Sequence, residues 1–415
     1  MMRSMFAGVS GLRNHQTKMD VLGDNISNVN SVGFKASRAS FSEVFSQTLR
    51  GASAPGDELG GSNAQQVGLG SALASIDVLH QQGSLQTTGR DTDMAIEGEG
   101  LFVLQQGEQS YYTRAGDFQP DAEGYLVNPG GLRLQGWLAN DGELPEDMDV
   151  NTMEDIRIPV GETLEAQATD RVAYANNLNA DADADADEPA SWSTPVEVFD
   201  SQGTQHTLDA IFTKEDHNNW VIDLAFENGE IDGFADENIT FNNGLPDDDP
   251  SQAITLEIQD ENDDVLEEIE VNLDFTGITQ FSGESTVSAV ERTGYPMGDL
   301  ESFSADEQGR ITGEYSNGRT RTLAQVALSA FSNPEGLIKA GNGLFSSSNN
   351  SGMEHVGTPG TASRGTIAPG ALEMSNVDLG EQFTEMISTQ RGFQANSRTI
   401  TTADEMLNEL VNMRR

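Results

Sequence analysis

The chain has 415 residues, roughly two to three times the usual size of one domain, so we expect two or three domains. Its 22 Lys and Arg residues against 68 Asp and Glu residues give a formal charge of −46, which excludes nucleic-acid binding through a basic surface. The absence of cysteine excludes disulfides, thiolate-held metals and a cysteine nucleophile, and no apolar run reaches the roughly 18 residues that a membrane helix needs.

An apolar repeat of seven residues predicts a helix at the N-terminus. The repeated residues are Met5, Leu12, Met19 and Ile26. Asn28, Asn30 and Gly33 follow, and we expect them to end the helix, with Gly33 in a left-handed conformation. The only apolar stretch in this segment is short and is interrupted by Arg13, so we expect no cleavable secretory signal.

The middle of the chain alternates apolar and polar residues, which is the pattern of half-buried strands. The alternating apolar sets are Trp220, Ile222, Leu224 and Phe226, then Ile254, Leu256 and Ile258, then Ile269, Val271, Leu273 and Phe275. Residues 101–104 and 132–137 are two further predicted strands, and the 43 glycines fit many tight turns. These patterns predict a β-rich body.

The negative charge is confined to this middle. Residues 1–50 carry six basic and three acidic side chains, and residues 371–415 carry four basic and seven acidic ones, so the two ends together are neutral. Residues 51–370 hold 12 basic and 58 acidic side chains. Such a surface is typical of a protein that works at high salt, where screening weakens its self-repulsion.

Clusters of carboxylates raise calcium binding as an alternative. Residues 247–249 and 260–264 are acidic, but neither segment has the residue order and the distant Glu of a calcium loop. We therefore favour a solvated acidic surface and expect no metal site. Residues 181–188 alternate Asp with Ala, which predicts an exposed loop or linker.

A second repeat of seven residues predicts a helix at the C-terminus. The repeated residues are Leu379, Met386, Phe393, Ile400 and Leu407. Gln390, Ser397 and Asp404 interrupt this stripe. Ser375, with Asp378 three residues later, predicts a capping box at the start of the helix.

Both terminal stripes are only half apolar, which leaves two interpretations open. Each helix could pack on a globular core of its own, as most amphipathic helices do. Alternatively, the helices become ordered when many copies pack together, because short helices with weak seams are marginal alone in water.

Catalytic patterns are missing from the sequence. The five histidines are never closer than eleven residues, no G-x-S-x-G sequence is present, and the Gly-rich segments 68–70 and 98–100 lack the lysine of a phosphate loop. With 68 carboxylates, pairs at glycosidase-like separations arise by chance. We therefore expect no enzyme, no cofactor, and no catalytic, cofactor-binding or metal-binding residues.

The two ends of the chain carry longer motifs. Residues 19–35 read MDVLGDNISNVNSVGFK and, with residues 10–12, resemble the N-terminal motif of bacterial flagellar rod and hook axial proteins. Residues 375–407 resemble the C-terminal motif of that family. Residues 93–128 look like the first body of the axial proteins, and residues 275–328 are similar to the hook members in particular.

Some positions depart from the pattern of this family. Asp24 stands where Asn is usual, Ser27 where Ala is usual, and Gly392–Phe393 where a bulkier helix former followed by Tyr is common. A glycine inside a helix costs about 1 kcal/mol relative to alanine. These departures therefore concern the stability of the helices and leave the apolar stripes unchanged.

The resemblance implies a mixed fold, with all-β central domains inserted one within another and flanked by terminal α-helices that pair like a coiled coil. We expect four parts. They are a helical polymerisation domain (1–33 with 371–415), an extended linker region (34–75), a β-rich inner domain (76–145 with 285–370) and an inserted acidic β-rich outer domain (146–284).

The implied function is that of a flagellar hook subunit, which self-assembles into a hollow, flexible tube that couples the rod to the filament and transmits torque. We expect the nine residues of the two apolar repeats to form the polymerisation seam. The implied partners are further copies of the chain, the rod, the hook cap, the hook–filament junction proteins and the flagellar export apparatus, with no nucleic acid and no membrane insertion. The implied location is extracellular, in the flagellum, after export without a cleaved signal. The alternatives are a distal rod-type axial protein and an acidic extracellular calcium-binding adhesin.

Overall fold

The computed structural model divides the chain into two compact units. The first unit comprises residues 1–159, 303–313 and 321–415, and the second comprises residues 160–302 and 314–320. The residues that the structure describes are 2–52, 54, 60–159, 161, 163–183, 190–227, 229–234, 237–247, 250–259 and 265–413. Within these ranges, no helix is long and apolar enough to cross a membrane.

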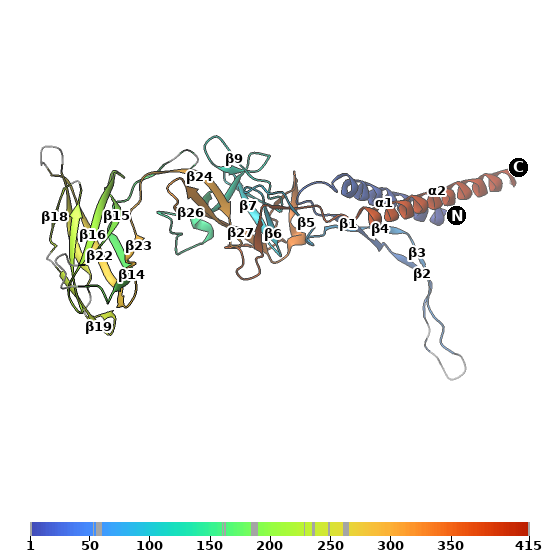
Figure 1. Cartoon of the computed structure of the whole chain (residues 1–415). Helices are drawn as coiled ribbons and strands as arrows, with labels where there is room; N and C mark the ends of the chain where they lie inside the picture. Colours follow the sequence, from blue (N-terminus) through green and yellow to red (C-terminus); the bar gives the residue numbers. More distant parts are fainter. Residues whose placement is uncertain are drawn as a thin grey trace. The chain divides into compact units, whose positions relative to one another are not determined.

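The fold class agrees with the prediction, because strands dominate the chain and one long helix lies at each end (Figure 1). The helices are α1 (Met2–Ser27) and α2 (Leu379–Met413). Two short 3-10 helices, η1 (Val150–Thr152) and η2 (Pro334–Gly336), lie in loops of the first unit.

The first unit contains most of the short strands. They are β1 (Ser37–Glu43), β2 (Ser46–Arg50), β3 (Gln65–Gly68), β4 (Ser71–Val78), β5 (Leu85–Thr87), β6 (Met94–Glu97), β7 (Leu101–Gln106), β8 (Gln109–Thr113), β9 (Gln119–Pro120), β10 (Leu126–Val127), β11 (Arg133–Leu138), β12 (Glu154–Asp155), β26 (Thr320–Val326), β27 (Leu328–Phe331), β28 (Ile338–Gly341), β29 (Leu344–Ser346), β30 (Glu354–Gly357), β31 (Thr366–Pro369) and β32 (Ala371–Glu373). The central strands of its main sheet follow the order β26-β11-β7-β8-β29-β28. This sheet buries Leu104, Leu134 and Trp137 completely.

The second unit contains two five-stranded sheets, ordered β18-β21-β22-β14-β23 and β15-β16-β17-β19-β20. Its strands are β13 (Thr163–Leu164), β14 (Arg171–Asn179), β15 (Ser191–Phe199), β16 (Gln205–Asp216), β17 (Asn219–Phe226), β18 (Gly229–Asp232), β19 (Glu237–Asn242), β20 (Leu245–Pro246), β21 (Gln252–Gln259), β22 (Val265–Phe281) and β23 (Ser288–Arg292). Strands β24 (Gly298–Ala305) and β25 (Arg310–Tyr315) carry the chain from one unit into the other.

The predicted alternating strands are confirmed in the second unit. In β22, the apolar residues Ile269 to Phe275 of the alternating set are buried, whereas Glu268 and Glu270 are exposed. The apolar faces of both sheets meet in one core, in which Phe212 and Phe275 contact each other edge to face. Each sheet therefore buries its apolar face and leaves carboxylates on the other face, as a period of two residues requires.

The predicted acidic clusters lie largely outside the described residues. This holds for residues 184–188 of the Asp–Ala run, for residues 248–249 and for residues 260–264.

The start of α2 differs from the prediction. Ser375 was expected to cap the helix, but α2 begins at Leu379, and Asp378 occupies the capping position. Oδ1 of Asp378 accepts hydrogen bonds from the backbone N of Gly380 (2.8 Å) and of Glu381 (3.2 Å). The capping box centred on Ser375 was therefore wrong, because Asp378 is the residue that satisfies the free N–H groups of the first turn.

Gly33 has the predicted left-handed conformation, with φ 66°. The helix itself already ends at Ser27, and a turn separates it from Gly33. A β-carbon on Gly33 would lie 2.4 Å from the backbone N of Ala115. Glycine is therefore needed here both for its backbone angle and for the close approach of another segment.

Candidate assembly site

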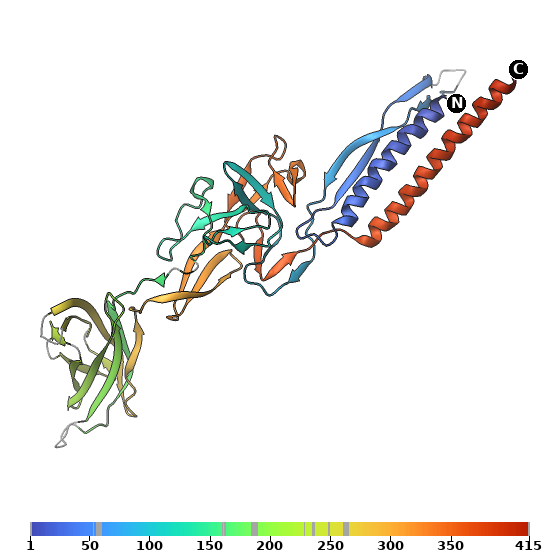
Figure 2. The same ribbon diagram turned by 90° about the horizontal axis from the view of Figure 1, so that it is seen from above.

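The two terminal helices lie side by side and antiparallel, as two views show (Figures 1 and 2). Nζ of Lys18 lies 3.2 Å from Oε2 of Glu385, and Nδ2 of Asn25 donates to Oε1 of Gln382 at 3.0 Å. Near the start of α1, Gly8 faces Ile400. Partner numbers on α2 thus fall as those on α1 rise, so the first and last segments of the chain form one helix pair.

The nine residues of the predicted polymerisation seam all lie on this helix pair. Eight are half-buried, and Leu379 is 40% exposed. The half-buried residues are Met5, Leu12, Met19, Ile26, Met386, Phe393, Ile400 and Leu407. Their partial exposure is compatible with contacts inside one chain and with contacts to other copies, so their role in polymerisation stays a prediction.

Four of the most buried side chains of the helix pair lie outside the nine predicted seam residues. Leu22 and Asn25 on α1, with Thr389 and Ala403 on α2, are each at most 3% exposed. Three of these four are small or polar, so hydrophobicity alone gave no signal for them. Thr389 and Ala403 lie three residues after Met386 and Ile400 of the apolar repeat. In a helix pair with a period of 3.5 residues, such positions face the partner helix as well.

The glycine at position 392 has a structural reason. A β-carbon on Gly392 would lie 2.6 Å from both Cε1 and Nε2 of His15 on α1. The glycine therefore leaves space for the imidazole ring. Its low helix propensity weakens α2 at this position, but its small size lets the two helices come close together.

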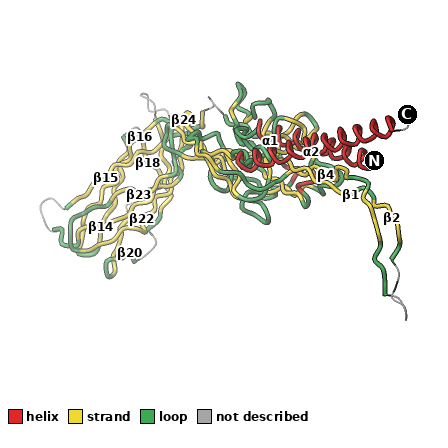
Figure 3. The backbone as a smooth tube through the Cα atoms, turned by 90° about the vertical axis from the view of Figure 1, so that its right-hand side faces the viewer, coloured by secondary structure: helices red, strands yellow, loops and turns green. Residues whose placement is uncertain are grey.

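The strands between residues 37 and 78, which we call the arm, form two successive antiparallel pairs, and β1 and β4 lie against α1. Strand β1 pairs with β4 and strand β2 pairs with β3, both antiparallel (Figure 3). The arm is attached to α1 by polar contacts. Nδ2 of Asn14 donates to Oγ of Ser71 at 2.8 Å, and Asn25 exchanges hydrogen bonds of 2.8 and 2.9 Å with the backbone of Ser37.

Exposed apolar side chains concentrate on the helix pair and the arm. Most of the large hydrophobic residues that are exposed in the described parts of the chain lie there. They include Phe6, Val44, Phe45, Leu49, Leu69, Leu73, Ile76, Phe383, Ile387, Met406, Val411 and Met413. Contiguous exposed apolar surface on a soluble protein usually marks an interaction site.

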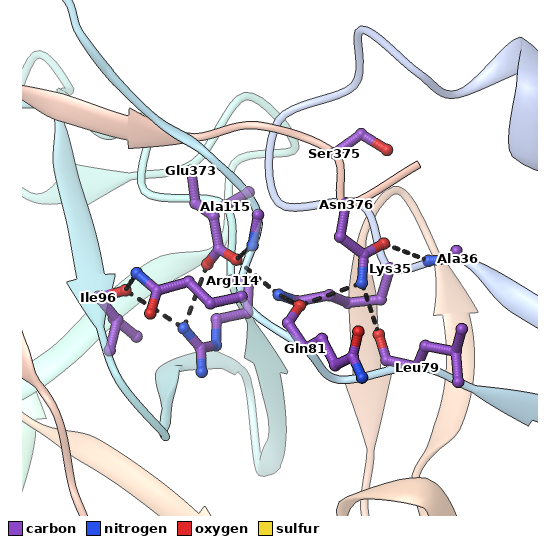
Figure 4. A network of polar contacts seen from close by, with 12 residues as sticks. Lys35, Ala36, Leu79, Gln81, Ile96, Arg114, Ala115, Glu373, Ser375 and Asn376 are labelled. Atoms are coloured by element: carbon purple, nitrogen blue, oxygen red, sulfur yellow. Dashed lines mark hydrogen bonds and ion pairs between the residues drawn. The ribbon is translucent and has the colours of Figure 1, made fainter. Parts of the chain in front are cut away.

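A buried ionic cluster joins the helix pair to the β-rich part of the first unit (Figure 4). We call Lys35, Arg114, Glu373 and Asn376 the anchor. Nζ of Lys35 lies 2.6 Å from Oε1 of Glu373, and Nη1 of Arg114 lies 3.1 Å from Oε2 of the same carboxylate. Both the Lys35 and the Glu373 side chains are fully buried, so one carboxylate faces two cations in the interior of the protein.

Further hydrogen bonds satisfy the remaining atoms of this cluster. Oε1 of Glu373 also accepts from the backbone N of Gly83 at 2.7 Å, and Nζ of Lys35 donates to the carbonyl of Gln81 at 2.7 Å. Nη2 of Arg114 donates to the carbonyl of Gly98 at 2.6 Å. Burial lowers the pKa of Lys35 and of Arg114, while the charge of Glu373 opposes this effect in both.

Asn376 holds the same segments together through its amide. Its Oδ1 accepts from the backbone N of Ala36 at 2.8 Å, and its Nδ2 donates to the carbonyls of Leu79 (2.8 Å) and Gln81 (3.0 Å). The backbone N of Gly33 donates to the carbonyl of Glu373 at 2.7 Å. The segments after α1, after the arm and before α2 are thus fixed at one point, from which both helices leave.

His80 lies against this anchor. Its ring contacts that of Phe345, with 5.4 Å between the centroids, and its Nε2 is buried without a hydrogen-bond partner in the described structure. Burial, followed by the charges of Lys35 and Arg114, lowers the pKa of His80 to about 4. The imidazole is therefore neutral at physiological pH.

The second unit carries most of the charge of the chain. Residues 160–302 and 314–320 contain 36 acidic and four basic side chains. Among the described residues, no group of three or more His, Asp or Glu side chains is arranged to hold a metal ion.

Four family models match successive parts of the chain. They are "Flagella basal body rod protein" over residues 5–35, "Flagellar hook protein FlgE/F/G D1 domain" over residues 95–170, "Flagellar basal body protein FlaE D2 domain" over residues 166–295 and "Flagellar basal body rod FlgEFG protein C-terminal" over residues 368–413.

Curated proteins match over the whole chain. The chain is 42% identical over 464 residues to the flagellar hook protein FlgE of Treponema pallidum (strain Nichols), with all of both chains covered. It is 34% identical to the protein of that name from Escherichia coli (strain K12), with 98% of each chain covered, and 30% identical to the flagellar basal-body rod protein FlgG of Bacillus subtilis (strain 168), with all of both chains covered.

Among solved structures, the crystal structure of Helicobacter pylori flagellar hook protein FlgE2 is similar with a TM-score of 0.53 and 15% identity. The match covers 70% of this chain and 100% of that one. At this identity the similarity concerns the fold.

Proposed function

This chain belongs to the bacterial flagellar hook protein family, and from that premise we propose that it assembles through its terminal helices and arm into the flexible tube of the hook. It is a structural protein, a polymeric component of the flagellum. In the proposed tube, copies of the chain couple the rod to the filament and transmit torque.

The observation that carries the proposal is the position of the exposed apolar side chains. The helix pair and the arm expose residues such as Phe45, Phe383 and Ile387, each at least 50% accessible. Residues 1–50 and 371–415 are together neutral, so copies can approach there without repulsion. Each large apolar side chain that becomes buried contributes about 1.5–3 kcal/mol.

We also propose the finer division of the chain and its partners. The helical part (1–33 with 371–415) would polymerise, with the seam of Met5, Leu12, Met19, Ile26, Leu379, Met386, Phe393, Ile400 and Leu407 taking part. The chain would meet the rod, the hook cap and the hook–filament junction proteins, and would reach them through the flagellar export apparatus without a cleaved signal. These proposals follow from membership of the family.

The alternatives have less support. A distal rod protein would share both ends, and one relative bears a rod-protein name, but the relatives of higher identity are hook proteins and the FlaE D2 model matches residues 166–295. A calcium-binding adhesin is not favoured either, because the relatives described above bear flagellar names.

Immunogold electron microscopy of the source cells tests the function directly. An antibody against residues 190–227, which lie in the second unit, should label a short curved segment between the cell envelope and the filament. As a control, an antibody against the flagellar filament would show that antibodies reach the flagella of these cells. Gold spread along the filaments or over the cell surface would contradict the proposal.

A further inference from the structure

Apolar repeats of seven residues leave the register of two helices ambiguous. If α2 slides by one repeat along α1, Met5, Leu12, Met19 and Ile26 meet apolar positions of α2 again, because those positions also recur every seven residues. Many assembling helices select one register with a non-equivalent position in the seam. The helix pair of this chain needs such a feature, since its seam is only half apolar.

Three close contacts in the helix pair are candidates for this feature. Each places a glycine of one helix against a larger side chain of the other. A β-carbon on Gly8 would lie 3.2 Å from Cγ1 of Ile400, and one on Gly11 would lie 2.5 Å from Nδ2 of Asn396. On the other helix, Gly392 receives His15, as described above.

We propose that two of these contacts, those of Gly11 and Gly392, fix the register of α1 against α2 and thereby determine which apolar row the helix pair offers to the next copy. The inference rests on the proposed function, because the outward row matters only if copies assemble. The exposed row on α2 contains Leu379, Phe383 and Ile387, which are 40%, 50% and 52% exposed. These residues follow each other by four positions and so share one face.

A shift by one repeat would replace the partner at all three contacts. His15 would then face Glu385 or Thr399 instead of Gly392. Gly11 would face Thr389 or Ala403 and leave space beside a smaller side chain. Gly8 would face Phe393 or Leu407, which are again large and apolar. The apolar stripe and Gly8 therefore do not distinguish these registers, whereas the contacts of Gly11 and Gly392 do.

The polar contacts of the pair agree with this register. The Lys18–Glu385 ion pair and the Asn25–Gln382 hydrogen bond continue the same antiparallel alignment toward the end of α1. Lys18 and Glu385 are 30% and 43% exposed at their side chains, so the ion pair contributes little energy. We therefore assign the selection of register to the contacts of Gly11 and Gly392.

The test is an exchange of the large and small residues at one contact. The full-length chain has no cysteine, so Lys18→Cys with Glu385→Cys supplies a single cysteine pair, and its disulfide within one chain, separated from linked dimers by non-reducing electrophoresis, reports the register. In this background, Gly392→His alone should lower the rate of disulfide formation at least tenfold. Adding His15→Ala should restore most of that rate, because the larger side chain then faces the smaller one again.

Gly23→His is the matched control. Gly23 lies inside α1 as Gly392 lies inside α2, but a β-carbon on Gly23 would have no atom within 4 Å. This variant should keep the parent rate of disulfide formation. If Gly392→His also kept the parent rate, or if the exchange with His15→Ala restored nothing, the inference would be wrong.

Assembly of the same variants, followed by pelleting and electron microscopy, separates this inference from the proposed function. Tubes formed by Gly392→His despite a lost disulfide would refute the register inference and leave the proposed function intact. If the parent chain formed the disulfide but assembled into no tubes at any salt concentration, polymerisation through this helix pair would be refuted. The inference about the register would be unaffected.

Discussion

Removing the charge of Glu373 is the perturbation with the most definite expectation. Glu373→Gln keeps the size of the side chain and one carbonyl oxygen, but it leaves Lys35 and Arg114 without their shared negative partner. All three side chains are at most 5% exposed, so water cannot replace the carboxylate. Breaking a buried ion pair by removing one partner costs about 3–5 kcal/mol.

Hydrogen exchange of the full-length chain, read by mass spectrometry, measures this loss where it occurs. Peptides that contain residues 33–36, 79–83 and 371–376 should exchange on the order of 10²–10⁴ times faster in Glu373→Gln, because the anchor opens more often. Peptides from residues 205–226 in the second unit should not change, since that unit has its own core.

Glu385→Gln is the matched control for this experiment. Its partner Lys18 is half-exposed, and an exposed pair contributes roughly 0–1 kcal/mol, so exchange at the anchor should stay as in the parent. If Glu373→Gln accelerated exchange no more than this control, the anchor would not hold the terminal segments, and the reasoning from buried charge would fail.

Three further predictions concern assembly and stability. Phe393→Asp should abolish polymerisation, because it places a charge in the seam. Circular dichroism and tryptophan fluorescence of the β-rich units should stay unchanged. If this variant still formed tubes that sediment, the assignment of the seam would be wrong. Stability should fall with acid through His80: the folded pKa of about 4 lies below the unfolded value of 6.5, so the unfolded chain takes up the proton first and stability is lost as pH falls from 6.5 to 4. The free energy of unfolding, measured in urea, should fall by at most about 3 kcal/mol over this range, and by less in His80→Phe. If His80→Phe lost as much as the parent chain, the pH dependence would belong to other groups. Assembly followed by turbidity should weaken as salt is lowered, because repulsion between copies of the acidic second unit is then unscreened; indifference to salt would remove the electrostatic argument.

Local patterns in the sequence predicted the strands well, for a physical reason. The alternation from Ile269 to Phe275 requires only that one face of a strand is buried, and each residue carries that information itself. Capping was harder, because both Ser375 and Asp378 can accept a backbone N–H, and only the three-dimensional path of the chain decides between them.

The anchor could not be predicted from local pattern. Lys35 and Glu373 are 338 residues apart, and a lysine and a glutamate at such a distance give no periodic signal. His15 and Gly392 are a similar case. The sequence marked Gly392 as unusual for a helix, but its reason is the imidazole ring at the other end of the chain. Contacts of this kind depend on which segments meet, and a single sequence does not contain that information in its spacing.

The distribution of charge and the distribution of exposed apolar surface have a common explanation. A chain with a formal charge of −46 can pack against its own copies only where it is locally neutral, since the Debye length of about 8 Å at physiological salt screens distant charges but not touching ones. The first 50 and last 45 residues meet this condition, and they contain the helix pair and the start of the arm. The second unit holds 36 acidic against four basic side chains, so we expect its contacts with other copies to be hydrated and weak. The proposed polymer would then have strong contacts at the helices and weak, deformable ones at the acidic unit, and that combination is what a tube needs if it is to bend while it transmits torque.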